Sequence, residues 1–124
     1  MDGCLLSLWN SINKRRREKQ ELKENISQIY HLLADKNDEE TWMLAFSLAL
    51  ETLPEDILNY CISDRDNHYV DYYEYLKGPL TLRDILELGL RHKEIEPVRK
   101  HTYSFIWGIK LTVNHILYNV IKTT

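Results

Sequence analysis

The sequence predicts an all-α fold, and three features of the chain support that prediction. Apolar residues recur at the three- and four-residue spacing of helix faces over most of the 124 residues. The chain contains 4 glycines and 3 prolines, whereas a β-sandwich or barrel needs many turns. The prolines, at positions 54, 79 and 97, fall between the periodic stretches. We therefore expect one domain of about five to seven helices with short connections.

The N-terminal third predicts two helices separated by a basic run. Residues 2–12 have the spacing of a short helix, with Trp9 as its aromatic anchor, and residues 14–19 carry five basic side chains. From about residue 17 to residue 34, apolar side chains occupy one face of a second helix. The basic run is either a solvated helix start, which we favour, or a contact with nucleic acid.

The middle of the chain predicts two further helices and a polar tip. Asn37 or Asp38 caps a helix over residues 38–52 that is apolar nearly all round. Pro54 begins a short helix that continues to about residue 62. Residues 63–68 are the most polar stretch and should form an exposed tip. The tyrosine-rich residues 69–75 fit either a strand or a helix, and either a protein contact or a partly buried face.

The C-terminal segment, residues 98–124, is the most informative part of the sequence. This segment comes after a predicted helix over residues 82–93, which begins at the capping-box pattern of Thr81 and Asp84. Pro97 separates that helix from the segment and marks a new start. The segment's apolar residues lie on nearly every side, although a surface helix of a monomer shows one apolar stripe. Either a monomer core hides these residues or a second copy of the chain covers them. We favour the second copy.

Composition excludes several classes of protein. The net charge of −3 does not fit a chain that binds polyanions with its whole surface. Cys4 and Cys61 lie far apart and fit two reduced thiols, with a disulfide across a dimer interface as the alternative. The chain shows no signal peptide, and no apolar run approaches the ~20 residues of a membrane span. We therefore expect a soluble, non-secreted protein that does not insert into a membrane.

No residue pattern predicts a metal, a cofactor or catalysis. Asp64, Asp66 and His68 resemble the start of a calcium loop, but Tyr69 and Tyr75 occupy the positions that need glycine and glutamate. The five histidines form no ligand pair at metal spacing, and the chain has no glycine-rich phosphate loop. Cys61 fits a packing residue better than a nucleophile. We expect no enzymatic activity.

The C-terminal segment resembles the last helices of hepadnavirus core (capsid) proteins. The shared pattern, in chain order, is Arg99, His101, Tyr103, Trp107-Gly108, Thr112-Val113 and Ile121-Lys122-Thr123. Residues 26–52 are similar in a weaker way, through Ser27, Tyr30 and the ending Glu51-Thr52-Leu53. The resemblance covers about half of the chain, and residues 54–96 do not align.

The resemblance implies a capsid subunit, of the type expected in a non-enveloped, fish-infecting relative of the hepadnaviruses. The helical hairpins of two copies would pair into a four-helix bundle, and the dimers would then close an icosahedral shell. Residues 1–16 would form an arm or short helix, residues 17–107 the body with the hairpin, and residues 108–124 the contact helix, with Gly108 as the hinge. The implied dimer-interface residues are Trp42, Phe46, Leu50, Tyr103 and Trp107. The implied contacts between dimers are Val113, Ile116, Leu117, Val120 and Ile121.

The partners that follow are a second copy of the chain and the viral genome. Family members continue past the Ile-basic-Thr ending into a proline-rich segment and an arginine-rich tail, whereas this chain stops at Thr124. Nucleic acid would therefore bind through a basic tail that is not part of this sequence. The expected locations are the virion and the host cytoplasm or nucleus. The alternative is a small virus-encoded module, similar to Bcl-2 or death-fold proteins, that binds a host helix.

Overall fold

The computed structural model describes residues 2–35, 38–62, 80–95 and 102–123, and side chains within 5–34, 38–62, 80–95 and 105–123. Nearly all of the described residues are helical, and none of them forms a strand, which confirms the all-α prediction. The predicted tip at 63–68 and the tyrosine-rich stretch at 69–75 lie outside the described residues. The helices are α1 (Asp2–Asp35), α2 (Glu39–Thr52), α3 (Glu55–Leu58), α4 (Leu82–Leu90), the 3-10 helix η2 (His92–Glu94) and α5 (Thr102–Thr123).

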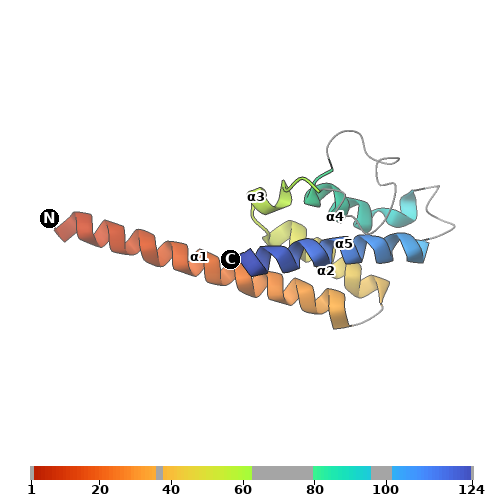
Figure 1. Ribbon diagram of the computed structural model, residues 1–124, viewed down its shortest axis with the longest axis horizontal. Coiled ribbons are helices and arrows are strands. Elements are labelled where there is room, and N and C mark those ends of the chain that lie inside the picture. Colours follow the sequence, from red (N-terminus) through yellow and green to blue (C-terminus); the bar gives the residue numbers. More distant parts are fainter. Residues whose placement is uncertain (1, 36–37, 63–79, 96–101, 124) are drawn as a thin grey trace.

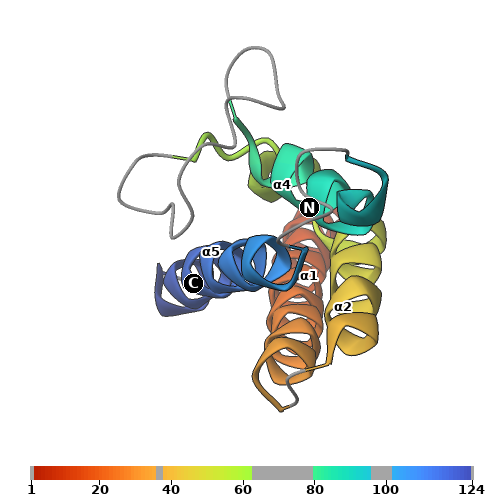
Figure 2. The same cartoon turned by 90° about the vertical axis from the view of Figure 1, so that its right-hand side faces the viewer.

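The helices form a small body from which one end of α1 projects. The C-terminal half of α1 packs beside α2, and α2 also packs against α4. α5 lies across this group and contacts α1, α2, α4 and η2 (Figures 1 and 2). The N-terminal half of α1 extends well past the other helices (Figure 1).

α1 is one continuous helix of 34 residues, so the prediction of two helices separated by the basic run is wrong. The reason is local. Lysine, arginine and glutamate are good helix formers, and neither glycine nor proline stands between residues 12 and 17 to interrupt the helix. The second half of α1 is held by Ile26, Ile29 and Leu33, which are buried in the core.

The helix starts follow the predicted caps. Asp38 precedes α2, and its side chain accepts a hydrogen bond from the backbone N–H of Glu40 at 3.1 Å. Thr81 and Asp84 form the predicted capping box at the start of α4, since the Asp84 carboxylate accepts from the Thr81 N–H at 2.9 Å and the Thr81 hydroxyl accepts from the Asp84 N–H at 3.3 Å. Such caps satisfy N–H groups that have no partner inside the helix.

α3 is shorter than the helix predicted after Pro54, because the chain leaves it to pair with the start of α4. The Ile62 N–H donates to the Leu80 carbonyl at 2.8 Å, and the Leu82 N–H donates to the Tyr60 carbonyl at 3.0 Å. This antiparallel bridge uses backbone groups that a longer helix would have used internally.

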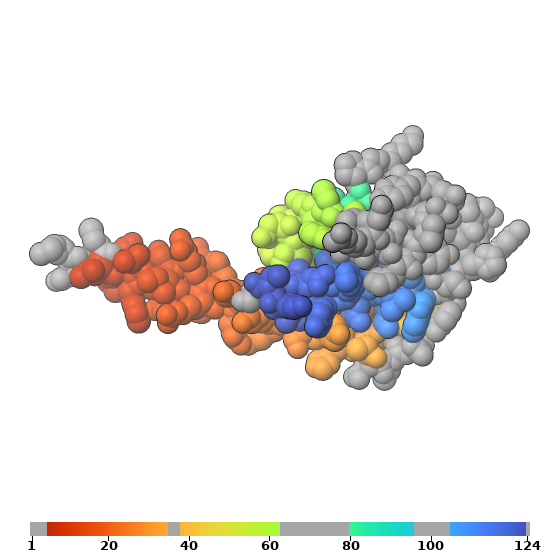
Figure 3. All heavy atoms as spheres, viewed as in Figure 1, coloured from red at the N-terminus to blue at the C-terminus, as the bar shows by residue number. Residues whose placement is uncertain are grey.

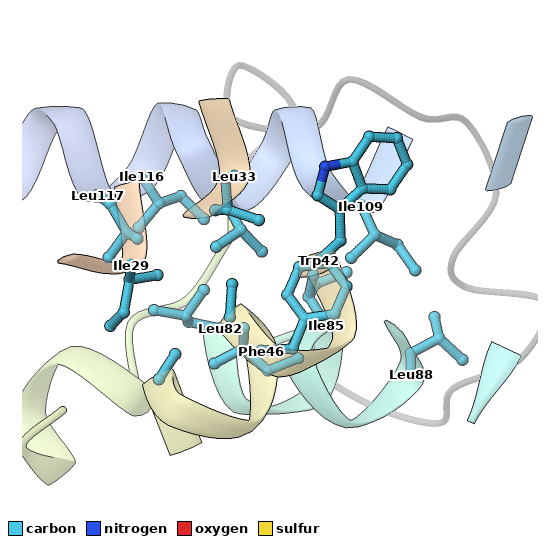
Figure 4. Packing of buried hydrophobic residues seen from close by; sticks show 14 of the residues in the cluster. Ile29, Leu33, Trp42, Phe46, Leu82, Ile85, Leu88, Ile109, Ile116 and Leu117 are labelled. Atoms are coloured by element: carbon cyan, nitrogen blue, oxygen red, sulfur yellow. The ribbon is translucent and has the colours of Figure 1, made fainter. Parts of the chain in front are cut away.

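One hydrophobic core joins all the long helices (Figure 4). Its largest fully buried side chains include both aromatic and aliphatic residues. They are Trp42, Phe46, Phe105, Ile26, Ile29, Leu33, Leu58, Leu82, Ile85, Leu86 and Ile106. At ~25 cal/mol per Å2 of apolar surface removed from water, this core is the main source of stability for the body.

α5 runs through Gly108 without interruption, so the hinge predicted there is not present in this structure. Gly108 continues the helical hydrogen bonding, and its carbonyl also accepts a bond from the Thr112 hydroxyl at 2.9 Å. A glycine inside a helix costs roughly 1 kcal/mol relative to alanine. The burial of Ile106 and Ile109 on either side of Gly108 outweighs that cost, because each contributes a fully buried side chain.

Gly89, in α4, lies close to side chains of both α2 and α5. A Cβ atom at this position would lie 2.7 Å from two ring carbons of Phe46 and 3.3 Å from a methyl carbon of Ile109. Both neighbours are buried, so neither can move into solvent. The absence of a side chain at Gly89 therefore lets α4 pack against α2 and α5.

We predict that Gly89→Ala destabilises the protein by about 1–3 kcal/mol, because the added methyl group overpacks the core at Phe46. Urea denaturation followed by circular dichroism measures the change. Glu87→Ala, an exposed position of the same helix, is the control and should change the free energy of unfolding by less than about 0.5 kcal/mol. An increase in stability, the usual result of replacing a helical glycine by alanine, would contradict the proposed close packing.

Candidate self-association surface

The structure places half of the predicted interface residues in the core of the chain itself. Trp42 and Phe46 are fully buried on the inner face of α2. Val113, Ile116 and Leu117 are buried on the face of α5 that lies against α1 and the rest of the body. Figure 4 shows Trp42, Phe46, Ile116 and Leu117 within one cluster. In this conformation these side chains are covered without a second copy.

The other predicted interface residues lie nearer the surface. Leu50, Trp107 and Val120 are half-buried, and Ile121 is 37% exposed. Tyr103 belongs to the first turn of α5, but its side chain lies outside the described part. The apolar pattern of the sequence therefore favours a second copy only at the residues that the core of the chain does not cover.

α5 has a second stripe of residues opposite its core face. With about 100° of rotation per residue, the positions 107, 111, 114, 118 and 121 fall on one side of the helix. We call Trp107, Leu111, Asn114, Tyr118 and Ile121 the outer stripe of α5. The first three are half-buried, whereas Tyr118 is 53% exposed. The sequence predicted apolar residues on nearly every side of this helix. In the structure, one face of α5 is buried in the core, and the outer stripe is only partly covered.

Two further features mark the C-terminal end of α5. A shallow groove of about 270 Å3 is lined by Tyr60, Ile116, Asn119, Val120 and Thr123. On the outer stripe, the side-chain oxygen of Asn114 is buried and makes no hydrogen bond within the described part of the chain. A buried acceptor without a donor is unfavourable.

A cation–π cluster anchors the start of the outer stripe to α2. The rings of Trp42 and Trp107 meet edge to face, with centroids 5.6 Å apart. The Lys110 ammonium lies 4.5 Å from the Trp107 ring centroid and 5.8 Å from that of Trp42. Lys110 is only 8% exposed, and burial lowers the pKa of its ammonium below the ordinary value of 10.5. The aromatic faces compensate part of the cost of burying this charge.

A buried histidine joins the end of α4 to the start of α2. His92 is fully buried, and its Nδ1 lies 2.6 Å from the carbonyl oxygen of Gly89. Because a carbonyl only accepts, Nδ1 carries the proton and donates to it. The other ring nitrogen lies 3.8 Å from a carboxylate oxygen of Glu39. This arrangement fixes the chain where α4 turns into η2.

No group of three or more His, Cys, Asp or Glu side chains among the described residues could hold a metal ion. Cys61 is a free, exposed thiol, so the prediction that it is a packing residue is wrong. The calcium-like pattern of Asp64, Asp66 and His68 lies outside the described residues. None of the helices in the described part is long and apolar enough to cross a membrane.

Comparison with known proteins adds no relative. No family model, curated protein or solved structure matches this chain. The function must therefore be inferred from the surfaces of the molecule. Of these, the outer stripe overlaps the predicted interfaces through Trp107 and Ile121, and the groove at the end of α5 overlaps them through Ile116 and Val120. The sequence analysis did not predict Leu111, Asn114 and Tyr118 as interface residues, although they follow Trp107 in successive steps of four, three and four residues, which places them on one helix face.

We predict that the stability of the protein rises with alkaline pH through Lys110. Its lowered pKa means that the folded chain releases this proton at a lower pH than the unfolded chain does. The unfolded state then binds more protons, so the free energy of unfolding increases from the folded pKa up to about 10.5. Lys110→Met removes this contribution.

Urea denaturation of both proteins from neutral pH to about pH 10 measures the effect as the difference between their pH slopes. Lys122→Met, in the last turn of the same helix, controls for the loss of one positive charge at an exposed position. Equal pH slopes for the wild type and Lys110→Met would show that Lys110 is not desolvated.

Proposed function

We propose that this chain is a self-associating structural subunit, and specifically a capsid (core) protein of the hepadnavirus-like type that encloses a viral genome. The observation that supports the proposal best is the outer stripe of α5. This stripe carries a tryptophan, a leucine, a tyrosine and an isoleucine on a helix whose opposite face already fills the core. Aromatic residues in such a position are typical of protein interfaces.

The proposed contact must extend along the stripe. A stable interface buries about 800 Å2 on each partner, which is more than Tyr118 and Ile121 alone can provide. A partner that also covers Leu111 and Trp107, both of them half-buried, would still bury less than that area, so the contact must continue beyond the stripe onto the neighbouring surface. Trp42 and Phe46 take no part in this contact, because they remain in the core of each copy.

A shell requires a second contact surface on each subunit. A single self-complementary surface forms a dimer and stops there, whereas larger assemblies need at least one other surface. Leu44, on the outer side of α2, is 60% exposed and borders a groove of about 790 Å3 between α1 and α2. This groove is the second surface that we assign to assembly.

The same groove supports the alternative function, a module that binds a host helix. Leu32 and Leu44 form an apolar strip within it, surrounded by polar residues such as Gln28, His31 and Thr41. An amphipathic helix fits grooves of this kind. A chain that stays monomeric and binds such a peptide would favour this alternative over the capsid subunit.

We predict that the purified chain forms dimers and larger particles at high concentration in raised salt, where its net negative charge is screened. Replacing Tyr118 and Ile121 together by Glu should weaken the association at least about tenfold, since two charges would enter an apolar contact. Both side chains are exposed, so the fold should persist. Light scattering after size exclusion and negative-stain microscopy give the readout.

Lys93→Glu is the matched control, because it changes the net charge by the same two units at an exposed position away from the outer stripe. It should associate like the wild type. A wild-type chain that remains monomeric under these conditions, with no particles, would exclude the capsid proposal. If the double variant associates as strongly as the wild type, the interface does not lie on the outer stripe.

A further inference from the structure

The projecting part of α1 exposes large apolar side chains that the body does not cover. Residues 5–19 of α1, which we call the arm, project from the body in Figure 3. At the base of the arm, Arg15, Glu18 and Lys19 line a groove together with Thr52, Pro54 and Asp56 of the body. The exposed fractions are 67% for Leu5, 60% for Leu6, 59% for Leu8 and 57% for Trp9. Large apolar residues that are exposed next to one another mark a site of interaction.

The apolar residues of the arm share one broad side of the helix. At about 100° per residue, Leu5, Leu6, Leu8, Trp9 and Ile12 span an arc of about 160°, with Trp9 near its middle. The opposite side carries Ser7, Asn10 and Ser11, which are small and uncharged. A contact between two paired helices needs a narrower stripe, sustained over about three heptads or more. The arm offers about two turns of a wide apolar face instead.

Basic residues follow the apolar arc and flank it on both edges. Residues 14–19 hold five basic side chains and one acidic one, in a chain whose net charge is −3. At about 100° per residue, Arg15 continues one edge of the arc and Arg17 the other, whereas Arg16 follows in line with its centre. Within the part of the chain that the structure describes, the one ion pair of this run joins Lys14 to Glu18 at 4.0 Å. Both side chains of that pair are well exposed, so it neutralises little of the charge.

We propose that the arm binds the surface of an anionic lipid bilayer. The apolar arc would enter the boundary between headgroups and acyl chains, while the flanking arginines would meet lipid phosphates. Tryptophan is enriched at this depth because its ring is apolar and its N–H is polar. The arm lies on the membrane rather than across it, in agreement with the lack of a spanning helix among the described residues. This inference does not rest on the proposed self-association.

The arm is favoured as a lipid contact over a nucleic-acid contact for one reason. Nucleic acid would use the basic residues but would leave Leu5, Leu6 and Leu8 in water. A bilayer covers both groups at once. The arm also projects past the other helices (Figure 1), so the body leaves its apolar residues uncovered.

The test is flotation of the full chain with lipid vesicles. We expect binding to phosphatidylcholine vesicles with about a third of phosphatidylserine, and little binding to phosphatidylcholine alone. Leu8→Glu with Trp9→Glu should lower the binding at least about tenfold, since both charges would face the acyl chains. The single substitution Trp9→Phe keeps an apolar ring and should retain most of the vesicle binding of the wild type. Arg15→Gln with Arg17→Gln should also weaken binding and should reduce its dependence on salt.

Lys93→Glu is the matched control, because at an exposed position of the body it changes the net charge by the same two units as the Leu8 and Trp9 substitutions, and it should bind vesicles like the wild type. Circular dichroism checks that each variant keeps its helices. Equal binding to neutral and anionic vesicles, or unchanged binding after the Leu8 and Trp9 substitutions, would overturn the proposal. Two other results would also overturn it. One is an arm-dependent dimer without vesicle binding, and the other is binding of RNA alone that depends on the arginines but not on Leu8 and Trp9.

Discussion

The described structure depends on the close approach of α4 to α2 and α5 around Gly89. A glycine at this point lets the Phe46 ring and Ile109 meet the backbone of α4 directly. The same turn of α4 supplies the carbonyl that holds His92, so the chain direction after α4 is fixed there as well. Once α4 is seated, α5 can lie across α1 and α2 and close the core. One missing side chain thus determines the spacing of three helices.

The parts of the fold that depend on neighbours in sequence were predictable. Asp38 and the pair Thr81 and Asp84 act as caps because their partners lie within three residues. The break expected near residues 14–19 was wrong, since a basic run changes the charge of a helix without ending it. The expected bend at Gly108 was wrong for a related reason. Packing on both sides of a glycine can maintain a helix that the glycine alone would weaken.

The candidate site was predicted only in part, because periodicity identifies residues that share a face but not the surface that covers that face. Trp42, Phe46 and Val113 were correctly recognised as residues that need cover, yet the cover comes from the same chain. Trp107 and Ile121 remain on a stripe that the core does not fully enclose. Deciding between the two cases requires the positions of α4 and α5, which depend on contacts between residues far apart in sequence.

The continuity of α1 has a consequence for how the arm becomes ordered. An isolated helix of about fifteen residues is marginal in water, because the first turn is costly to nucleate. In this chain the half of α1 that holds Ile26 and Ile29 provides the nucleus, and the arm only has to extend it one hydrogen bond at a time. The arm is therefore helical because it extends the packed half of α1, although few tertiary contacts stabilise it. Its backbone should open far more often than the packed half, with opening increasing toward the N-terminus.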